Sequence, residues 1–157
     1  MSSFTERGGW WVVIQFGLFG LYGLAIVATG PVAEGIGLGF ARIVGTVLVA
    51  VGAVAGIWAI LLHRGTVSVF PAPSEGSPLV AQGPYRFVRH PIYFAVISGT
   101  LGLSLALLRP GAVLVALALV PFFMAKSEHE ERMLMEHYPT YRDYRSEVRH
   151  RLIPWLL

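Results

Sequence analysis

Apolar residues along this chain gather in four long blocks, separated by short stretches that are polar or rich in glycine and proline. The blocks cover residues 10–28, 43–62, 92–108 and 112–125. About 20 consecutive apolar residues in a helix cross the hydrocarbon layer of a bilayer. The pattern therefore predicts an all-α, polytopic membrane protein with about four transmembrane helices and a C-terminal cytoplasmic helical segment.

The third and fourth blocks are predicted to form a tight helical hairpin, because Arg109, Pro110 and Gly111 between them are a turn signal. The fourth block is short for a span, but good helix formers follow it without a breaker until Pro139. We expect this helix to continue into water. The hairpin then brings the start of the third helix and the end of the fourth to the same membrane surface.

The composition agrees with a membrane protein. Of 157 residues, 55% are hydrophobic and only 13% are charged, which excludes a soluble globular enzyme. The absence of cysteine excludes a disulfide framework, a thiolate metal site and a cysteine nucleophile. A cleaved signal peptide is an alternative for the first block, but such a peptide begins with a positive segment, and here Glu6 and Arg7 cancel.

The basic residues are distributed unevenly. With four spans, ten of the 12 Lys and Arg residues fall on one side of the membrane, and only Arg42 and Arg109 fall on the other. The positive-inside rule then places both termini and the central loop in the cytoplasm. The sequence contains no basic stripe with interleaved aromatic residues, so it gives no indication of nucleic-acid binding. We expect a multi-pass protein of a prokaryotic cell membrane.

Small residues recur at helix-packing intervals in the apolar blocks. Examples are Gly17, Gly20 and Gly23 in the first block and the pair Gly52 and Gly56 in the second. Such spacing lets helix backbones approach closely in lipid. A dinucleotide-binding fingerprint is the alternative, but no strand precedes these glycines. We therefore expect packing faces.

A first polar cluster lies just before the third block, where Tyr85, Arg86, Arg89, His90 and Tyr93 fall within nine residues. The proline at position 91 suits the first turn of a helix, so free backbone amides near the cluster face the cytoplasm and favour an anion. The alternative is that the arginines hold lipid phosphates while the tyrosines form an aromatic belt. Spacing alone leaves both open.

A second polar cluster, residues 126–132, follows the fourth block and contains Lys126, Glu130 and Glu131. By itself it is also compatible with a solvated amphipathic helix. The predicted hairpin, however, makes the two clusters neighbours. We expect a cleft between them, roofed by the apolar segment 152–155, that suits a ligand with a carboxylate at one end and hydroxyl or amino groups at the other.

These residues resemble the integral-membrane methyltransferases of the isoprenylcysteine carboxyl methyltransferase and phospholipid methyltransferase group. The resemblance rests on Gly-Pro-Tyr-Arg-Phe-Val-Arg-His-Pro-Ile-Tyr at 83–93, Glu-Glu-Arg-Met-Leu at 130–134 and Ile-Pro at 153–154. It implies one methyltransferase domain, 1–157, in which residues 79–154 carry the family-like, cofactor-binding part. The two spans within 10–62 carry no comparable signature.

The resemblance implies S-adenosylmethionine as the cofactor, and it implies no metal. Arg89 and His90 would meet the methionine carboxylate, while Pro91 and Tyr93 would line the cofactor. The remaining cofactor contacts would come from the second cluster. There, Glu130 or Glu131 would meet the ribose hydroxyls or the amino group, and Leu134 would lie near the adenine.

The acceptor implied by the resemblance is a lipophilic or lipidated molecule, and two chemistries stay open. A carboxylate, as in an isoprenylcysteine, is already an anion and needs only positioning, by Arg86 or Arg145. A phospholipid amine must lose a proton, so Glu130, Glu131 or His129 would act as base. The predicted catalytic residues are therefore Arg86, Arg145 and Glu131.

Some positions depart from the family pattern, and two rival functions remain. Ala95 stands where glycine is common, and Tyr138-Pro139 replaces an aromatic-glycine pair. One rival is an NADPH-dependent sterol-type reductase, which shares the His-Pro-x-Tyr start of a span but usually continues with Gly-Asp rather than the Phe94-Ala95 found here. The other is a non-catalytic membrane protein that binds anionic lipid.

Overall fold

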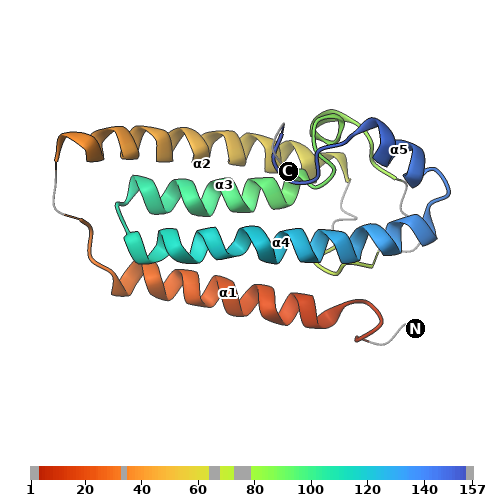
Figure 1. The fold of residues 1–157 in the computed structure, drawn as a ribbon, viewed down its shortest axis with the longest axis horizontal. Helices are drawn as coiled ribbons and strands as arrows, with labels where there is room; N and C mark the ends of the chain where they lie inside the picture. The colour runs from red at the N-terminus through yellow and green to blue at the C-terminus, as the bar shows by residue number, and fades with distance from the viewer. Residues whose placement is uncertain (1–3, 33–34, 64–67, 73–78, 155–157) are drawn as a thin grey trace.

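The structure is a computed structural model that describes residues 4–32, 35–63, 68–72 and 79–154, and these are helical and irregular, as predicted for an all-α chain. The elements are α1 (Gly9–Ala28), α2 (Ile36–Leu62), the 3-10 helix η1 (Gly83–Arg86), α3 (Pro91–Ala106), α4 (Pro110–His137) and α5 (Tyr141–Glu147). The long helices form an elongated bundle in the spatial order α2, α3, α4, α1 (Figure 1). The end of α2, the start of α3 and the end of α4 meet at one end of it, where η1 and α5 also lie.

Within the described part of the chain, three helices are long and apolar enough to cross a membrane: α1, α2 from Leu38 onward, and α4. The third predicted span is the shorter apolar helix, α3, with 16 residues. The helix from the fourth block continues past its apolar part to His137, as predicted. At 1.5 Å per residue it is about 42 Å long against a hydrocarbon layer of about 30 Å. Its last turns therefore extend beyond the apolar layer.

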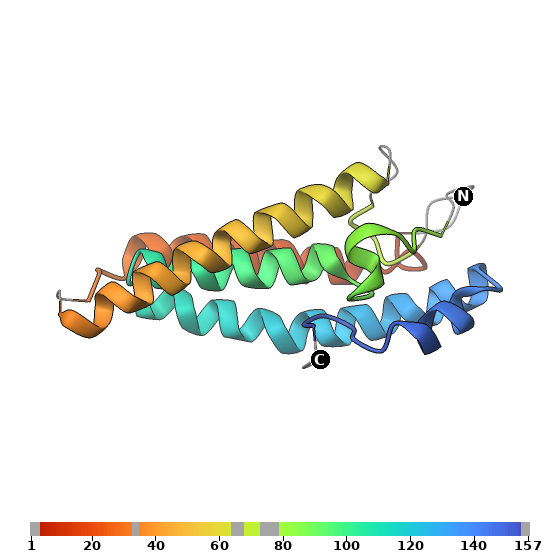
Figure 2. The ribbon, with the colours of Figure 1, turned by 90° about the horizontal axis from the view of Figure 1, so that it is seen from above.

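The predicted hairpin is confirmed, because α3 and α4 are joined by only three residues and pack side by side. Leu108 in this turn has φ 54°, and Pro110 begins α4 at a position where a missing N–H costs nothing. Figure 2 shows α2 crossing this hairpin at an inclination.

Glycines make the close contact between α2 and α3. A methyl group on Gly102 would come within 2.6 Å of the Gly45 carbonyl oxygen, so no larger residue fits without a shift of the backbone. Gly52 lies against Ser98, and a methyl group on Gly56 would lie 2.8 Å from Ala95 Cβ. The packing face predicted for the second apolar block is therefore confirmed.

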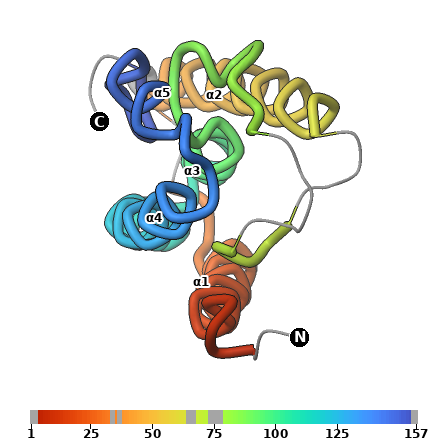
Figure 3. Tube along the Cα trace, turned by 90° about the vertical axis from the view of Figure 1, so that its right-hand side faces the viewer, coloured from red at the N-terminus to blue at the C-terminus, as the bar shows by residue number. Residues whose placement is uncertain are grey.

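The same prediction is wrong for α1. Side chains at Gly17, Gly20 and Gly23 would meet nothing within 4 Å. The helix contacts mainly α4, and the end view in Figure 3 shows it on the far side of the bundle from α2. A polar contact also ties it to α3, since the Tyr22 hydroxyl donates a hydrogen bond to the Thr100 carbonyl at 2.8 Å. The glycines of α1 are therefore part of an apolar span and do not form a close contact with another described helix.

Candidate active site

The two polar clusters meet at the end of the hairpin, as predicted. Arg89 lies just before α3 and Glu131 lies near the end of α4. Arg89 Nε donates a hydrogen bond to Glu131 Oε1 at 2.7 Å, and His90 Nε2 lies 3.2 Å from the same oxygen. Because Pro91 begins α3 with His90 as its N-cap, both side chains leave the backbone at the point where the helix starts.

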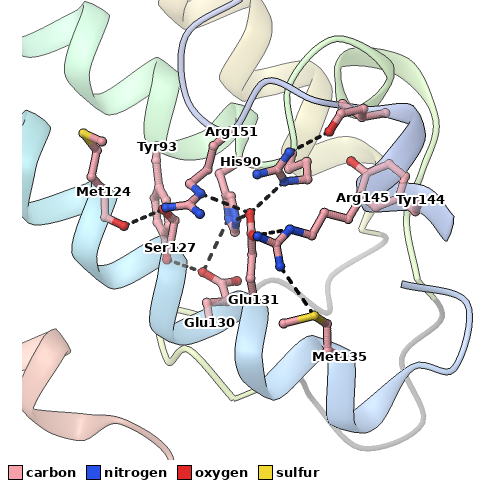
Figure 4. A network of polar contacts seen from close by, with 12 residues as sticks. His90, Tyr93, Met124, Ser127, Glu130, Glu131, Met135, Tyr144, Arg145 and Arg151 are labelled. Atoms are coloured by element: carbon pink, nitrogen blue, oxygen red, sulfur yellow. Dashed lines mark hydrogen bonds and ion pairs between the residues drawn. The ribbon is translucent and has the colours of Figure 1, made fainter. Parts of the chain in front are cut away.

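Glu131 is the centre of this network (Figure 4). Its residue surface is 1% exposed. Besides Arg89 and His90, Arg145 Nε lies 3.5 Å from Oε2 and Arg151 Nε lies 3.5 Å from Oε1. Three guanidinium groups and an imidazole thus surround one buried carboxylate. Such an arrangement makes removal of the carboxylate costly, because buried cations would remain without their partner.

Arg89 also binds the segment that follows α5. Its Nη1 donates hydrogen bonds to the carbonyl oxygens of Val148 at 2.6 Å and Arg149 at 2.8 Å, and its backbone N–H donates to the His150 carbonyl. Leu152 further along the segment is fully buried. Arg89 therefore joins α3, α4 and the C-terminal segment.

Glu130, the neighbour of Glu131, faces a different environment. The Tyr93 hydroxyl donates a hydrogen bond to Glu130 Oε2 at 2.7 Å, and His90 Nδ1 lies 3.6 Å from that oxygen. The His90 and Tyr93 rings are stacked, with centroids 5.4 Å apart, and Tyr93 stacks in turn on Phe123. The Glu130 side chain keeps 23% of its surface exposed, so it can accept a further hydrogen bond.

A cavity of about 200 Å³ opens beside Glu130. It is bounded by α1, the end of α2, residues 68–72, η1, α3, α4 and α5. The charged, amide, imidazole and phenol side chains that line it are Gln15, His63, Tyr85, Arg89, His90, Tyr93, Lys126, Glu130, Tyr138, Tyr141 and Tyr144. Four tyrosines from η1, α4, α5 and their flanks, Tyr85 among them, line the cavity, whereas the expected roof, the C-terminal segment, contributes none of the lining residues. Residues 155–157 lie outside the described chain.

One of these tyrosines has an unsatisfied hydroxyl. The Tyr141 side chain is buried, and among the described residues its oxygen has no hydrogen-bond partner. Tyr144 differs, since its hydroxyl donates to the Tyr85 carbonyl at 2.8 Å. Burial raises the pKa of both phenols, and the Glu131 carboxylate raises that of Tyr141 further. Tyr141 therefore stays protonated, and its side chain, which carries this unpaired buried donor, also lines the cavity.

At the other end of the cavity lies a buried lysine. Lys126 is 1% exposed, and its ammonium group donates hydrogen bonds to Gln15 Oε1 of α1 and, at 3.0 Å, to the Val69 carbonyl. It also lies 5.3 Å from the centroid of the Tyr93 ring.

The comparison with known families decides the identity. Residues 40–141 match the phospholipid methyltransferase family, which covers about two thirds of the chain. The chain belongs to this family. Phospholipid methyltransferases use S-adenosylmethionine, so the protein is a multi-pass membrane methyltransferase rather than a reductase. No curated protein matches the chain in sequence. The family match includes α2 from Phe40 onward and leaves α1 outside.

In this member of the family, five of the residues singled out from the sequence line the cavity: Arg89, His90, Tyr93, Glu130 and Leu134. The other four do not. Glu131 lies behind them in the network, and Pro91 faces a separate apolar groove between α2 and η1. Arg86 is exposed, as is Arg145, which reaches Glu131 from the outside.

Several residues that line the cavity of this methyltransferase have no signal in the sequence that indicates their contacts. Gln15 is the only amide in an otherwise apolar span. Its position in the span indicates a polar contact, but the sequence does not show with which residue. Lys126 belongs to the second polar cluster, but the sequence assigned it no contact. His63 Nε2 lies 2.6 Å from the Tyr85 hydroxyl, a contact across 22 positions that no local pattern indicates. For Tyr141 too, no local pattern indicates that the side chain lines the cavity.

Proposed function

We propose that this protein transfers the methyl group of S-adenosylmethionine to the carboxylate of a lipophilic, isoprenylcysteine-like acceptor at the cytoplasmic face of the membrane. The observation that carries the proposal is the cavity at the end of the spans, in which the arginine–histidine pair and Glu130 face a common space beside the unsatisfied Tyr141 hydroxyl. Methyl transfer requires the two reactants to be held together with water excluded, and an aromatic-lined, partly closed cavity suits that requirement.

The cavity residues fit the cofactor chemically. Glu130 has an accessible carboxylate, the usual acceptor for ribose hydroxyls or an amino group, and Leu134 supplies an apolar surface for the adenine. Arg89 Nη2 makes no hydrogen bond to a described residue, so it and His90 are assigned to the methionine carboxylate. Tyr93 is assigned to the cofactor wall. When bound, S-adenosylmethionine supplies an electrophilic methyl group.

The remaining predicted residues have indirect or peripheral roles in the proposal. Glu131 positions Arg89 and His90, because it binds both on the side away from the cavity. Pro91 fixes the start of α3. Arg86 and Arg145 are exposed outside the cavity, so their assignment to the acceptor carboxylate stays a prediction about how the acceptor approaches.

A carboxylate acceptor gives up no proton, so its methylation requires no base. The second candidate is N-methylation of a phospholipid amine, and Glu130 is the observation that favours it, because this carboxylate faces the cavity. Glu131 and His129, the other two residues expected as bases, do not face the cavity. Glu131 is enclosed by cations, and His129 packs against Trp11, with ring centroids 5.7 Å apart.

The experiment is incubation of the purified protein and a host lipid extract with radiolabelled methyl donor, followed by base treatment of the lipids. Base-labile label, from an ester, supports the carboxylate acceptor, whereas stable label identifies an amine. Titration with S-adenosylhomocysteine tests the cofactor site independently. Absence of binding by the folded protein would overturn the proposed function.

A further inference from the structure

Lys126 and Gln15 form a buried polar pair at the membrane side of the cavity. Gln15 is 8% exposed and comes from α1, and Lys126 comes from α4, 111 positions later. Both lie near the apolar parts of their helices, where polar side chains are costly and commonly serve function. The pair is also the point where α1, outside the family match, reaches the cavity.

The charge of Lys126 has no carboxylate partner within 4.0 Å in the described part of the chain. Its two hydrogen bonds go to neutral oxygens, those of Gln15 and Val69. An ammonium group has three donors, so one donor is left in a group that lines the cavity. A buried cation without an anion is unfavourable. An anionic ligand would supply both the missing charge and the missing hydrogen-bond acceptor.

The position of Lys126 separates it from the cofactor contacts proposed above. On α4 it lies one turn before Glu130, on the side of the spans, and the apolar side chains of Val96 and Phe123 line the same part of the cavity. Tyr93 contacts both groups: its ring centroid lies 5.3 Å from the Lys126 ammonium, and its hydroxyl donates a hydrogen bond to the Glu130 carboxylate. An anion bound to Lys126 would therefore be attached to an apolar molecule that extends toward the spans.

We propose that Lys126, positioned by Gln15, binds the anionic group of the lipophilic methyl acceptor. This inference rests on the proposed function and gives it an acceptor class: an amphiphile whose anion either is the methylated carboxylate or lies next to a methylated amine. Gln15 holds the ammonium toward the cavity without neutralising it. The first helix thus contributes to acceptor recognition.

The test compares three variants with the wild-type protein in detergent. Lys126→Met removes the charge, and Gln15→Glu keeps Lys126 but supplies an internal carboxylate that competes with the ligand. Arg132→Met is the matched control, because it removes one positive charge from an exposed position of the same helix. The probes are N-acetyl-S-farnesylcysteine, its neutral carboxamide, dispersed phosphatidylethanolamine and S-adenosylhomocysteine. Thermal unfolding checks that each variant is folded.

We expect the wild-type protein and Arg132→Met to bind an anionic probe about 10- to 100-fold more tightly than Lys126→Met does, as for a desolvated charge pair that loses one partner. Gln15→Glu should lose affinity in the same direction. The affinity for S-adenosylhomocysteine should fall much less than the affinity for the anionic probe, since neither Lys126 nor Gln15 is assigned to the cofactor. Selective loss with the farnesylcysteine acid identifies a carboxylate, and selective loss with the phospholipid identifies a phosphate; either supports the inference.

Three results would overturn the inference. The first is that Lys126→Met binds the farnesylcysteine acid and the phospholipid as tightly as the wild-type protein does. The second is that the wild-type protein binds neither of these two probes. The third is that Lys126→Met loses as much affinity for S-adenosylhomocysteine as for the probe. A purely structural role for Lys126 gives a lower unfolding temperature with unchanged probe selectivity. If S-adenosylhomocysteine fails to bind the wild-type protein, it is the proposed function that fails.

Discussion

Glu131 Oε1 and Arg89 Nε lie 2.7 Å apart, although 42 positions separate them in the chain. Arg89 in turn binds two carbonyl groups of the segment after α5. This single contact therefore links the start of α3, the end of α4 and the C-terminal segment. Glu130, which precedes Glu131 in the chain, faces the cavity instead. The two glutamates of the motif consequently have different expected effects on mutation.

Glu131→Gln is expected to lower the free energy of unfolding by about 3–5 kcal/mol, because it leaves buried cations without their carboxylate. Glu130→Gln is the matched variant. It should cost about 1 kcal/mol or less, since only the Tyr93 hydrogen bond is altered, while weakening S-adenosylhomocysteine binding. Unfolding of both in detergent and calorimetric titration provide the measurements. Equal stability losses would show that Glu131 is not the structural centre.

Tyr141→Phe should weaken S-adenosylhomocysteine binding about 5- to 10-fold, the value of one hydrogen bond, without a loss of stability, because the hydroxyl it removes has no partner among the described residues. Tyr144→Phe is the control. It loses the hydrogen bond to the Tyr85 carbonyl and should be destabilised by about 1 kcal/mol. Unchanged cofactor affinity in Tyr141→Phe would remove this residue from the proposed site.

Gly102→Ala is expected to destabilise the protein by about 1–3 kcal/mol, because the added methyl group meets the backbone of α2. Gly20→Ala adds the same methyl group to α1 where nothing lies within 4 Å, so it should be neutral or slightly stabilising. Unfolding temperatures in one detergent compare the two directly. A similar loss in both would contradict the close contact between α2 and α3.

Acidification should destabilise the protein partly through His63, which follows the last residue of α2. Burial lowers the pKa of its imidazole below the ordinary 6.5, and Glu130 opposes this shift. The folded state therefore favours neutral His63. Its contribution to stability is complete above about pH 6.5 and is lost as the pH falls through the folded pKa. The unfolding temperature should fall more between pH 7.5 and 5 in wild type than in His63→Phe, and parallel slopes would refute this.

The orientation inferred from charge can be tested with single cysteines, because the chain has none of its own. A cysteine at Ser146 in α5 should react with an impermeant maleimide only from the cytoplasmic side. A cysteine at Val32, beyond the other end of α1, should react only from outside. The reverse pattern would invert the topology and move the cavity to the external face. Ser74, in the central loop, lies outside the described residues.

Local sequence determined the helices and the meeting of the two clusters. Apolar block length sets where a chain can cross lipid, Pro110 sets where α4 begins, and the three-residue connection leaves the hairpin little choice of partner. Because that connection is short, Arg89 and Glu131 had to become neighbours. The sequence predicted a ligand cleft between them, and only the structure shows that the two side chains form a direct ion pair.

Only the tertiary structure decided which groups face the cavity. Glu130 and Glu131 are adjacent in sequence, and the 100° turn between successive helical residues separates one into the cavity and the other into the cation cluster. The contact of Gln15 with Lys126 depends on how α1 packs against α4. In lipid, the faces through which two helices pack are not marked by a strong hydrophobic pattern, so the sequence does not predict this contact. Contacts between distant, individually unremarkable side chains arise from packing geometry, which no local pattern encodes.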